Sequence, residues 1–237
     1  MPSTNDTSQP TFPAQSDPNP GEFGTVAVLG GTGPQGRGLA RRFAAAGIPV
    51  VIGSRDAGRA GQAAEPMAAA GLPVTGQDNA GAAAAGDIVI VAVPYEGHED
   101  LLKSLTAELE GKIVVDCVNP LGFDKQGAFY LDVPAGSAAQ EAAAVLPGSR
   151  VVAAFHHVSA VVLEDESVDQ VETDVLVLGE DREATDLVGR LADIVPGMRG
   201  IFAGRLRNAG QVEALTANLI SVNRRYKAHA GLRVTDV

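Results

Sequence analysis

The sequence predicts an α/β fold, in which a doubly wound parallel sheet is followed by a small C-terminal α+β domain. From residue 25 onward, short apolar runs alternate with amphipathic stretches, as in chains that repeatedly place a helix between two strands. The runs are apolar nearly throughout and rich in β-branched residues, which is typical of strands buried on both faces of a sheet. After about residue 155 the pattern changes, and a smaller unit follows.

The expected elements follow from these patterns in chain order. Strands are expected at 26–29, 49–52, 87–92, 112–115 and 151–154. Helices are expected between them at 35–46, 57–70, 79–85 and 96–109. In the smaller unit we expect strands at 173–178 and 198–202, and helices at 181–194 and 208–225. The last of these helices carries one apolar stripe, whose members recur every three or four positions.

The chain divides into three expected regions. Residues 1–23 form a tail rich in Pro, Ser, Thr, Asn and Gln, which we expect to be disordered; a partner-binding arm is the alternative. Because the tail lacks the apolar and basic regions of a signal peptide, we place the protein in the cytoplasm. Residues 24–154 are expected to form a nucleotide-binding domain, and residues 155–237 a small domain that covers its ligand.

Composition and charge argue against several classes of protein. The 237 residues include 18 Lys and Arg against 29 Asp and Glu. The resulting net charge of −11 repels phosphate backbones, so nucleic-acid binding is not expected. No run approaches 18 consecutive apolar residues, and no membrane-spanning segment is expected. The single cysteine excludes an internal disulfide and a thiolate zinc cluster, and no metal site is expected.

A glycine-rich turn links the first expected strand to the first helix. Gly31, Gly33 and Gly36 fit the pattern G-x-G-x-x-G, which in this setting predicts a Rossmann-type dinucleotide site; a turn without a ligand is the alternative. The first glycine would allow the tight turn, the second would let backbone amides approach a pyrophosphate, and the third would permit close helix–strand packing. Pro34 suits the first helical turn, whose free amides carry partial positive charge.

The end of the second strand bears on the choice between NAD and NADP. An NAD site usually places an acidic residue there to hold the ribose 2′-hydroxyl. This chain instead has Ser54 and Arg55, with Arg59 one helical turn later. A hydroxyl and two guanidinium groups suit a 2′-phosphate, so NADP is favoured. Asp56 follows the arginine and fits better as the start of a helix, although an acidic ribose contact is the competing interpretation.

Several segments stand in a fixed order along the chain: GGTGPQGRGLARRFAAAG (30–47), VVIGSR (50–55), AVPYE (92–96), NPL (119–121), VAAFHHVSA (152–160), DVLVLG (174–179), AG (203–204), VEALT (212–216) and AGLR (230–233). The glycine loop alone is unspecific, but the ordered set resembles the NADPH-dependent reductases of the deazaflavin coenzyme F420, also called F420-dependent NADP reductases. The resemblance spans about residues 24–237. It implies an oxidoreductase that transfers a hydride between NADP(H) and coenzyme F420.

The resemblance also implies roles for residues at matching positions. The residues implied to cradle the pyrophosphate are Thr32, Gly33, Pro34 and Gln35. Those implied to hold the 2′-phosphate are Ser54, Arg55 and Arg59. Those implied to line the nicotinamide half of the site are Tyr95, Leu121 and Ala160. Near the chain end, Ala230 is implied to touch the deazaflavin.

The chain departs from the family pattern at two positions in the expected site. Pro34 stands where a polar residue is expected, and Gly210 replaces an arginine that some relatives carry. If that arginine helps to hold the deazaflavin, this protein uses another group. The basic cluster of Arg224, Arg225 and Lys227 either complements the dipole of the last helix or meets the anionic phosphate and polyglutamate tail of the deazaflavin.

Four further residues admit more than one role. His156 and His157 are either polar residues bonded to backbone at a strand end, or His156 borders and orients the deazaflavin. Hydride transfer requires no protein acid or base, so no catalytic nucleophile is expected. Cys117 is expected to be inert packing, and His98 a surface residue rather than a metal ligand.

Two other functions share these sequence features. One is an NADP-dependent reductase that acts on a flavin, an imine or a metal, because related folds serve several acceptors. The other is a non-catalytic NADP-sensing protein, since hydride transfer leaves no obligatory acid–base residue to find. Small-molecule cofactors are the expected partners, and a homodimer is the oligomeric state left open.

Overall fold

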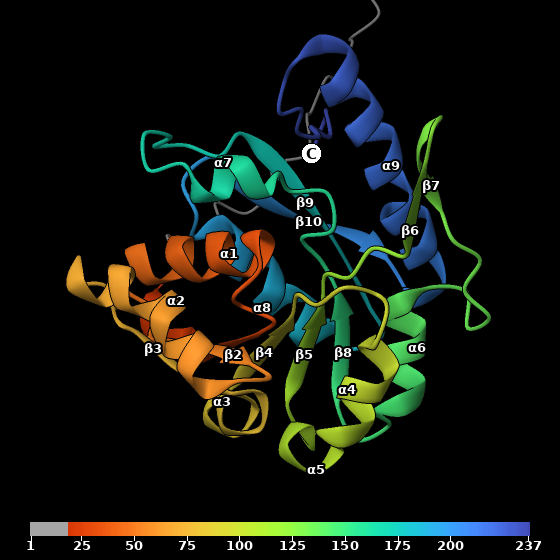
Figure 1. The fold of residues 1–237 in the computed structure, drawn as a ribbon. Helices are drawn as coiled ribbons and strands as arrows, with labels where there is room; N and C mark the ends of the chain where they lie inside the picture. Colours follow the sequence, from red (N-terminus) through yellow and green to blue (C-terminus); the bar gives the residue numbers. More distant parts are fainter. Residues whose placement is uncertain (1–18) are drawn as a thin grey trace, which may run out of the picture.

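The computed structural model describes residues 19–237, which are built around an eight-stranded sheet (Figure 1). The strand order is β10-β9-β8-β5-β4-β1-β2-β3. Neighbouring strands run parallel except β8 and β9, which are antiparallel. The strands are β1 (Val26–Leu29), β2 (Val50–Ser54), β3 (Val74–Asp78), β4 (Ile88–Val91), β5 (Ile113–Asp116), β8 (Arg150–Ala153), β9 (Thr173–Gly179) and β10 (Met198–Gly204).

Helices cover both faces of the sheet, so the fold is doubly wound. On one face lie α1 (Pro34–Ala45), α2 (Ala57–Ala69), α7 (Ala160–Glu164) and α8 (Arg182–Asp193). On the other lie α3 (Asn79–Ala85), α4 (His98–Ser104), α5 (Thr106–Leu109), α6 (Ala138–Val145) and the start of α9 (Ala209–Tyr226). The strands β1, β4 and β5 are buried along their whole length, because alternate residues pack against the helices of opposite faces. The expected Rossmann-type fold class is confirmed.

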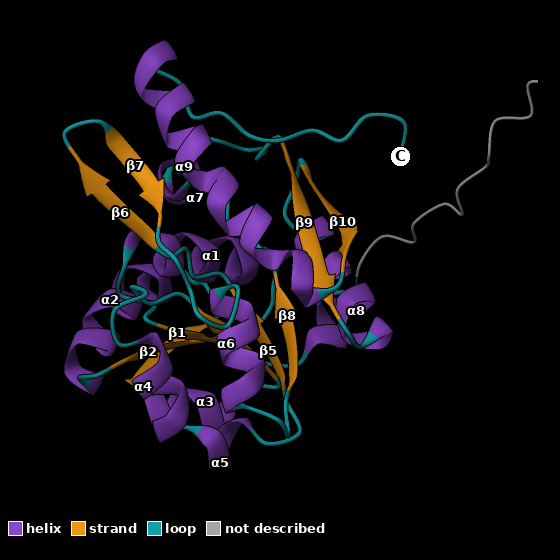
Figure 2. Ribbon diagram, turned by 90° about the vertical axis from the view of Figure 1, so that its right-hand side faces the viewer, coloured by secondary structure: helices purple, strands orange, loops and turns teal. Residues whose placement is uncertain are grey.

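The elements that the sequence did not reveal are short, polar or away from the main sheet. The edge strand β3 reads VTGQD, and only Val74 of it is buried. The hairpin of β6 (Leu121–Asp124) and β7 (Gly127–Tyr130) stands apart from the sheet and contacts α9 (Figure 2). The alanine-rich α6 and the five-residue α7 were also missed.

The single helix expected at 96–109 is wrong, because the structure has two helices there. The first, α4, begins only after Gly97, whose φ of 85° lies in the left-handed region. Leu105, with φ −119° and ψ 14°, then separates α4 from α5. The turn before α4 brings His98 into the interior, where it has no solvent exposure. The expectation that His98 lies on the surface is therefore also wrong.

The C-terminal part of the chain extends the same sheet. Strand β9 pairs with β8, and β10 pairs with β9, so the two strands extend the sheet beyond β8. The pair of β8 and β9 is antiparallel, unlike the strand pairs of the preceding region. Helix α8 packs against β9 and β10, whereas α7 packs against α1 of the preceding region. A division at residue 154 stays a prediction, and the sheet itself is continuous across it.

The expected disordered tail at 1–23 lies outside the described residues up to position 18. Its last residues depart from the expectation, since Pro20–Phe23 form a 3-10 helix capped by Asn19. The physical reason is Phe23, a large apolar side chain that is 1% exposed in the core beside α1. Glu22 adds an ion pair with Arg190 of α8 at 3.0 Å.

The C-terminal segment is fixed to the sheet by the buried carboxylate of Asp174 in β9. One of its oxygens accepts hydrogen bonds from Arg199 Nε and Arg233 Nη1, both at 2.8 Å. The other accepts from Arg199 Nη2 and the backbone N–H of Val234, both at 2.6 Å. These donors outweigh the effect of burial and hold the pKa of Asp174 well below its usual value.

Replacing this carboxylate should destabilise the fold in a pH-dependent way. Asp174→Asn should lower the free energy of unfolding at neutral pH by about 1.5–3 kcal/mol, the range for hydrogen bonds to charged groups. Because the folded pKa lies below the unfolded value of 3.8, the difference from wild type should be full above that pH and shrink as the pH falls below it. Urea denaturation at several pH values measures it.

Asp186→Asn is the matched control, because Asp186 pairs on the surface of α8 with an Arg182 side chain that is 92% exposed. It should change stability by no more than about 0.5 kcal/mol. Equal losses in the two variants would contradict the role given to Asp174.

Candidate functional site

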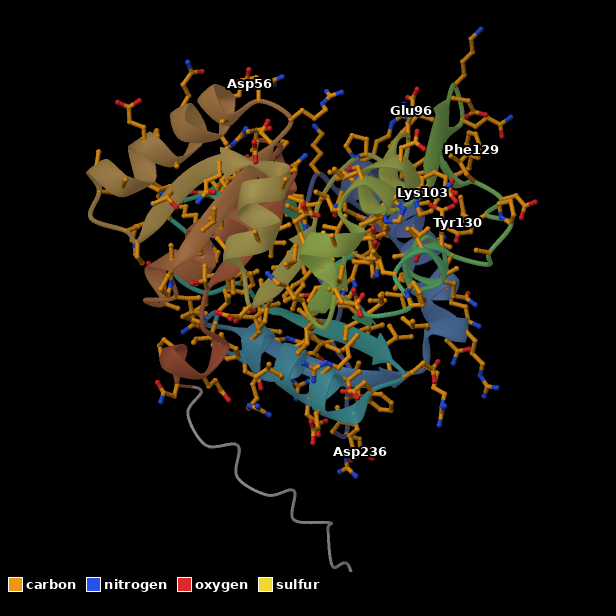
Figure 3. All side chains as sticks on the ribbon, turned by 90° about the horizontal axis from the view of Figure 1, so that it is seen from below. Asp56, Glu96, Lys103, Phe129, Tyr130 and Asp236 are labelled. Carbon is orange, nitrogen blue, oxygen red and sulfur yellow. The ribbon has the colours of Figure 1, made fainter. Side chains whose placement is uncertain are left out.

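Two adjoining cavities open where the strands β1, β4 and β5 end. This is the point at which the strand order reverses, and ligands of doubly wound sheets bind there. The first, of about 380 Å³, is called the glycine-loop cavity. Its lining comprises Gly30, Thr32, Gly33, Ser54, Arg55, Arg59, Asn79, Ala92, Val93, Pro94, Glu96, Gly97 and Leu101. Figure 3 shows which side of the molecule this is: Glu96, which lines the cavity, and Asp56, which follows the lining residue Arg55, lie on one side, and Asp236 lies on the opposite side.

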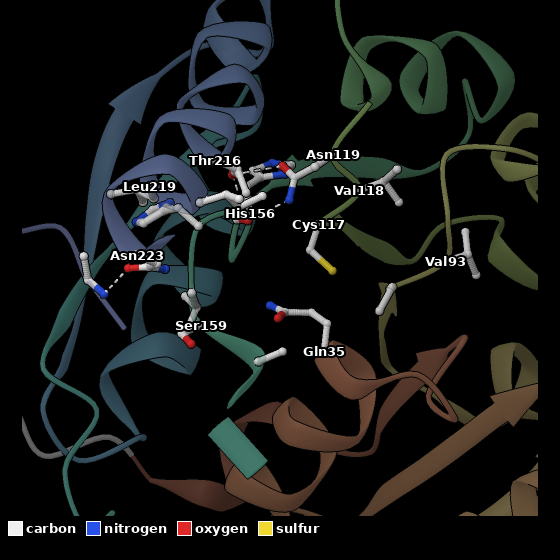
Figure 4. Close-up of a pocket in the computed structure, with 16 residues that line it drawn as sticks. Gln35, Val93, Cys117, Val118, Asn119, His156, Ser159, Thr216, Leu219 and Asn223 are labelled. Atoms are coloured by element: carbon white, nitrogen blue, oxygen red, sulfur yellow. Dashed lines mark hydrogen bonds between the residues drawn. The ribbon is translucent and has the colours of Figure 1, made fainter. Parts of the chain in front are cut away.

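The second cavity, of about 370 Å³, is called the histidine cavity. Ala92 and Val93 border both cavities, so the two lie side by side with these residues between them. The other residues that line it are Gln35, Cys117, Val118, Asn119, His156, His157, Val158, Ser159, Ala160, Thr216, Leu219, Ile220, Asn223 and Ala230 (Figure 4).

The glycines of the loop serve distinct physical needs. Gly30 makes the turn, with φ 72°, so the left-handed residue lies one position before the predicted motif. At Gly36 a Cβ would come within 2.7 Å of Gly31 Cα, which shows that α1 and the end of β1 pack too closely for any side chain. At Gly33 a Cβ would meet only the Gly30 carbonyl oxygen, at 3.5 Å. Gly33 is therefore open toward the cavity, where a ligand backbone could approach.

Helix α1 directs its first turn at the junction of the two cavities. Gly33 is its N-cap and Pro34 its first residue, so the loss of one N–H costs no helical hydrogen bond. The Gln35 side chain extends into the histidine cavity, where its Nε2 donates to the Phe155 carbonyl at 3.1 Å. The four residues expected around a pyrophosphate are thus consecutive but divided, with Thr32 and Gly33 in one cavity and Gln35 in the other.

The far wall of the glycine-loop cavity is cationic. Ser54 ends β2 and is nearly buried, whereas Arg55 and Arg59 are exposed at the start of α2. Among residues 19–237, no carboxylate forms an ion pair with either arginine. Asp56 is the N-cap of α2, and its side chain accepts from Arg59 N–H at 2.8 Å. The carboxylate is therefore committed to the helix start, and the two guanidinium groups are free to bind an anion.

His156 is the most unusual polar residue of the histidine cavity. It is 2% exposed; the backbone of Val118 lies near the ring, but neither ring nitrogen makes a hydrogen bond of good geometry with the described residues. Burial lowers its pKa to about 4, so the ring is neutral at neutral pH. The neighbouring His157 is different, because its Nε2 bonds the Asp174 carbonyl at 2.7 Å. Of the two roles expected from the sequence, a hydrogen bond to the backbone therefore applies to His157. His156 has unused hydrogen-bonding capacity that a ligand could satisfy.

Backbone geometry and polar contacts set the position of His156. The preceding Phe155 has φ 62°, a left-handed conformation uncommon for a bulky residue, and its ring packs edge-on against Phe43 at 5.9 Å. The His156 carbonyl accepts from Asn119 Nδ2 at 2.7 Å and from Thr216 Oγ1 at 3.1 Å (Figure 4). The loop after β5 and the helix α9 therefore fix the histidine together.

The remaining predicted residues are divided between cavity wall and surroundings. Ala160, at the start of α7, and Ala230 line the histidine cavity. Ala230 is held by its N–H, which donates to Asn223 Oδ1 at 2.7 Å. Tyr95 instead directs its hydroxyl at Glu141 Oε2, at 3.2 Å, and Leu121 starts the β6–β7 hairpin.

Several residues of the site escaped sequence reasoning. Asn79 lines the glycine-loop cavity, and its Oδ1 is buried without a partner among the described residues. It follows β3, a strand that the sequence did not reveal. Thr216 and Asn119 belong to segments that carried the resemblance, but no role was given to them. Asn223 lies on α9 one turn beyond Leu219, and both line the histidine cavity. The spacing of four positions, which places two side chains on the same face of a helix, is the signal in the sequence that could have found Asn223.

Cys117 lies in the wall of the histidine cavity as a weak donor. Its Sγ bonds the Val91 carbonyl at 3.0 Å, and burial raises the pKa of the thiol far above its usual value. The thiol is therefore protonated, in keeping with the inert role expected from the sequence.

Gly210 and the basic end of α9 bear on the departure from the family pattern that the resemblance implies. A Cβ at Gly210 would lie 2.6 Å from the Gly136 carbonyl oxygen, so a side chain does not fit there without a shift of that loop. Arg224 and Arg225 line a further groove between α9 and the β6–β7 hairpin. Ile220 borders both this groove and the histidine cavity, so the arginines lie beyond one end of that cavity.

No helix within residues 19–237 combines the length and apolarity needed to cross a membrane. Over the same residues, no group of three His, Cys, Asp or Glu side chains is arranged to hold a metal ion.

Comparison with known proteins places this geometry in a family. Residues 25–120 match the family described as NADP oxidoreductase, coenzyme F420-dependent. The chain is 40% identical over 221 residues to the F420-dependent NADP reductase of Methanothermobacter thermautotrophicus, covering 90% of this chain and 95% of that protein. It is also 40% identical over 221 residues to the protein of that name in Methanocaldococcus jannaschii, covering 90% and 98%.

Solved structures agree with this placement. A putative F420-dependent NADP reductase from Arthrobacter sp. FB24 superimposes with a TM-score of 0.76 at 26% identity, covering 89% of this chain and 98% of that one. An imine reductase from Myxococcus stipitatus, at 20% identity and a TM-score of 0.59, shares the fold over 86% of this chain and 62% of its own. The identity, coverage and shared fold together show that the chain belongs to the family of F420-dependent NADP reductases.

Proposed function

We propose that the protein transfers a hydride between NADP(H) and the deazaflavin coenzyme F420. The observation that carries this proposal is that two unlike cavities adjoin at Ala92 and Val93, which line both. One has an open glycine and unpaired arginines, and the other has a buried neutral histidine without bonding partners. Such a pair suits two cofactors whose reactive rings meet at the shared wall.

The glycine-loop cavity fits the nucleotide part of NADP(H). Thr32 and Gly33 would face the pyrophosphate, which gains from the free amides at the start of α1. Ser54, Arg55 and Arg59 would hold the 2′-phosphate, since a dianionic group between two unpaired guanidinium groups forms charge-assisted hydrogen bonds. This local arrangement attracts an anion despite the net charge of −11.

The histidine cavity fits the deazaflavin. The neutral His156 would donate or accept a hydrogen bond at the ring system and thereby orient it, while Ala160 and Ala230 present small side chains that allow close approach. When bound, the nicotinamide and deazaflavin rings themselves supply the hydride chemistry. The protein would contribute to the rate by holding the two rings at short distance and by excluding water from them. Tyr95 and Leu121, which are not among the residues that line the two cavities, would support the residues that contact the cofactors.

The arginines at the end of α9 would receive the anionic tail of the deazaflavin. Gly210 leaves no room for the arginine that some relatives carry, whereas Arg224 and Arg225 line a groove that joins the histidine cavity at Ile220. We further expect residues 155–237 to act as the unit that covers the deazaflavin. A homodimer and a cytoplasmic location remain expectations.

The decisive experiment mixes purified protein, NADPH and F420 and follows the visible absorbance of the deazaflavin. Bleaching that depends on both the enzyme and NADPH is the expected result. NADPH binding without bleaching would contradict the proposal and leave a reductase of another acceptor, such as a flavin, an imine or a metal, or an NADP sensor. Flavin and imine substrates offered under the same conditions separate those two alternatives.

Arg55→Ala should weaken NADPH binding far more than NADH binding, because only the 2′-phosphate loses a partner. The loss of a hydrogen bond between charged groups costs about 1.5–3 kcal/mol, so the Kd for NADPH should rise about 10- to 150-fold. Titration of both nucleotides measures the effect, and Arg182→Ala on the far helix α8 serves as control. A similar loss for both nucleotides would show that Arg55 does not recognise the phosphate.

Gly33→Val should abolish nucleotide binding while the fold is retained. The structure has room for a Cβ at this position, whereas a branched side chain would occupy the space that faces the cavity. Calorimetry with NADPH measures whether the nucleotide still binds, and a thermal melt measures whether the fold is retained. Gly61→Val, on α2 with nothing within 4 Å of a Cβ, is the matched control. Normal NADPH affinity in Gly33→Val would show that the loop is a structural turn and does not bind the nucleotide.

His156→Ala should raise the KM for F420 by about 2- to 10-fold, the cost of one neutral hydrogen bond, with a smaller fall in kcat. The affinity for NADPH should stay nearly unchanged. Because the pKa of His156 is lowered to about 4, the ring should give no break in the rate between pH 5 and 8. A fall in kcat of about 10³-fold with unchanged KM would instead identify an acid–base residue.

A further inference from the structure

A buried ion cluster lies behind the two cavities and takes no part in the function described so far. His98, at the start of α4, has no solvent exposure and lies between two carboxylates. Its Nε2 is 2.6 Å from Asp116 Oδ2 at the end of β5, and its Nδ1 is 2.9 Å from Glu141 Oε1 on α6. Three elements far apart in sequence therefore meet at one imidazole ring.

Each carboxylate uses its second oxygen to hold a neighbouring segment. Asp116 Oδ1 accepts from the backbone N–H of Val118 at 3.1 Å, and Val118 lines the histidine cavity. Glu141 Oε2 accepts from the Tyr95 hydroxyl at 3.2 Å. Tyr95 stands between Pro94 and Glu96, which line the glycine-loop cavity. The ring thus ties the loop after β4 to the loop after β5, one beside each cavity.

With both carboxylates ionised, the contacts require both ring nitrogens to carry a proton. A neutral imidazole has one donor and one lone pair, and the lone pair would face a carboxylate. The doubly protonated ring donates to both carboxylates and supplies the positive charge that buried carboxylates need. The two carboxylates outweigh the desolvation of the ring and raise the pKa of His98 to about 9.

We propose that His98 is a positioning residue whose imidazolium form sets the geometry of the loops after β4 and β5, and with it the affinity for NADP(H). The nucleotide readout rests on the proposed function, whereas the protonation of the ring does not. Because the pKa of the ring in the folded protein is raised to about 9, the ring is protonated and the clamp is complete at neutral pH, and the clamp is lost as the pH rises through about 9.

The neighbouring groups whose pKa values are shifted titrate away from pH 9. Burial raises the pKa of Tyr95 to about 12. Burial also raises the pKa of the Cys117 thiol, which stays protonated throughout the measured pH range. Glu99 of α4 is paired with Lys103 on the surface at 2.9 Å. On α9, burial raises the pKa of Glu213, which is electrostatically coupled to Asp116, to about 7, so it titrates at the low end of the measured range and before the ring does. His156, on the other side of Asp116, is neutral throughout.

The experiment measures the Kd of NADPH from pH 7 to 10.5 and, in the same range without ligand, the NMR titration of the histidine rings. The signal of His98 is assigned by its absence in His98→Gln. For wild type we expect a ring titration above pH 8 and a Kd that rises about 10-fold or more through the same transition, as expected for loss of a charge-assisted hydrogen bond. Circular dichroism verifies that the protein stays folded.

Glu141→Gln is the informative variant, because the amide preserves the size of the side chain and an acceptor for the ring but removes one negative charge. Both the ring titration and the break in NADPH affinity should move toward neutral pH by about one unit or more. Glu99→Gln is the matched control, on the same helix but without contact with the ring, and should move neither. His98→Gln should bind NADPH weakly at every pH and show no break.

A ring that titrates near 6.5, or a break that stays in place in Glu141→Gln, would overturn the proposal. So would a His98→Gln variant that melts at lower temperature but keeps the wild-type pH dependence, since that is what a purely structural role predicts. Failure of the proposed function looks different: F420 is not bleached at any pH, while the ring titration and the NADPH break remain. If NADPH does not bind, the ring titrations of wild type and Glu141→Gln still decide the protonation.

Discussion

The contact between Gly36 of α1 and Gly31 at the end of β1 is the constraint on which the site depends. No side chain fits between them, so the helix approaches the strand until its first turn lies at the edge of the sheet. That approach places the free amides of α1 at the point where the strand order reverses, and it brings Gln35 to the chain turn at Phe155. One glycine contact thereby sets where α1 starts relative to both cavities.

Two buried histidines that are both influenced by the charge of Asp116 show how the surroundings decide the chemistry of one residue type. His156 is buried without ring partners, so desolvation dominates, its pKa falls and it remains neutral. His98 is buried at least as deeply, but two carboxylates at 2.6 and 2.9 Å reverse the sign and raise its pKa. Burial alone therefore does not predict charge; the partners within hydrogen-bonding distance determine it.

The C-terminal part of the chain completes the site from outside. Helix α9 contributes Thr216 to the support of His156, and Asn223 holds the N–H of Ala230. Beyond Ala230 the chain is fixed by Asp174 and its two arginines. The wall of the histidine cavity thus depends on an ion cluster at the far edge of the sheet, which explains why a segment with little regular structure can have a defined position.

The sequence by itself determined the fold class, the central strands and the glycine loop, because apolar periodicity and glycine spacing are local properties of the chain. It also grouped Ser54, Arg55 and Arg59, which lie within six positions of one another. Tertiary structure alone decided that His98 is buried between Asp116 and Glu141, that Tyr95 faces Glu141, and that β9 and β10 extend the main sheet. These contacts join residues distant in sequence, and their burial and charge follow from packing that no local pattern records.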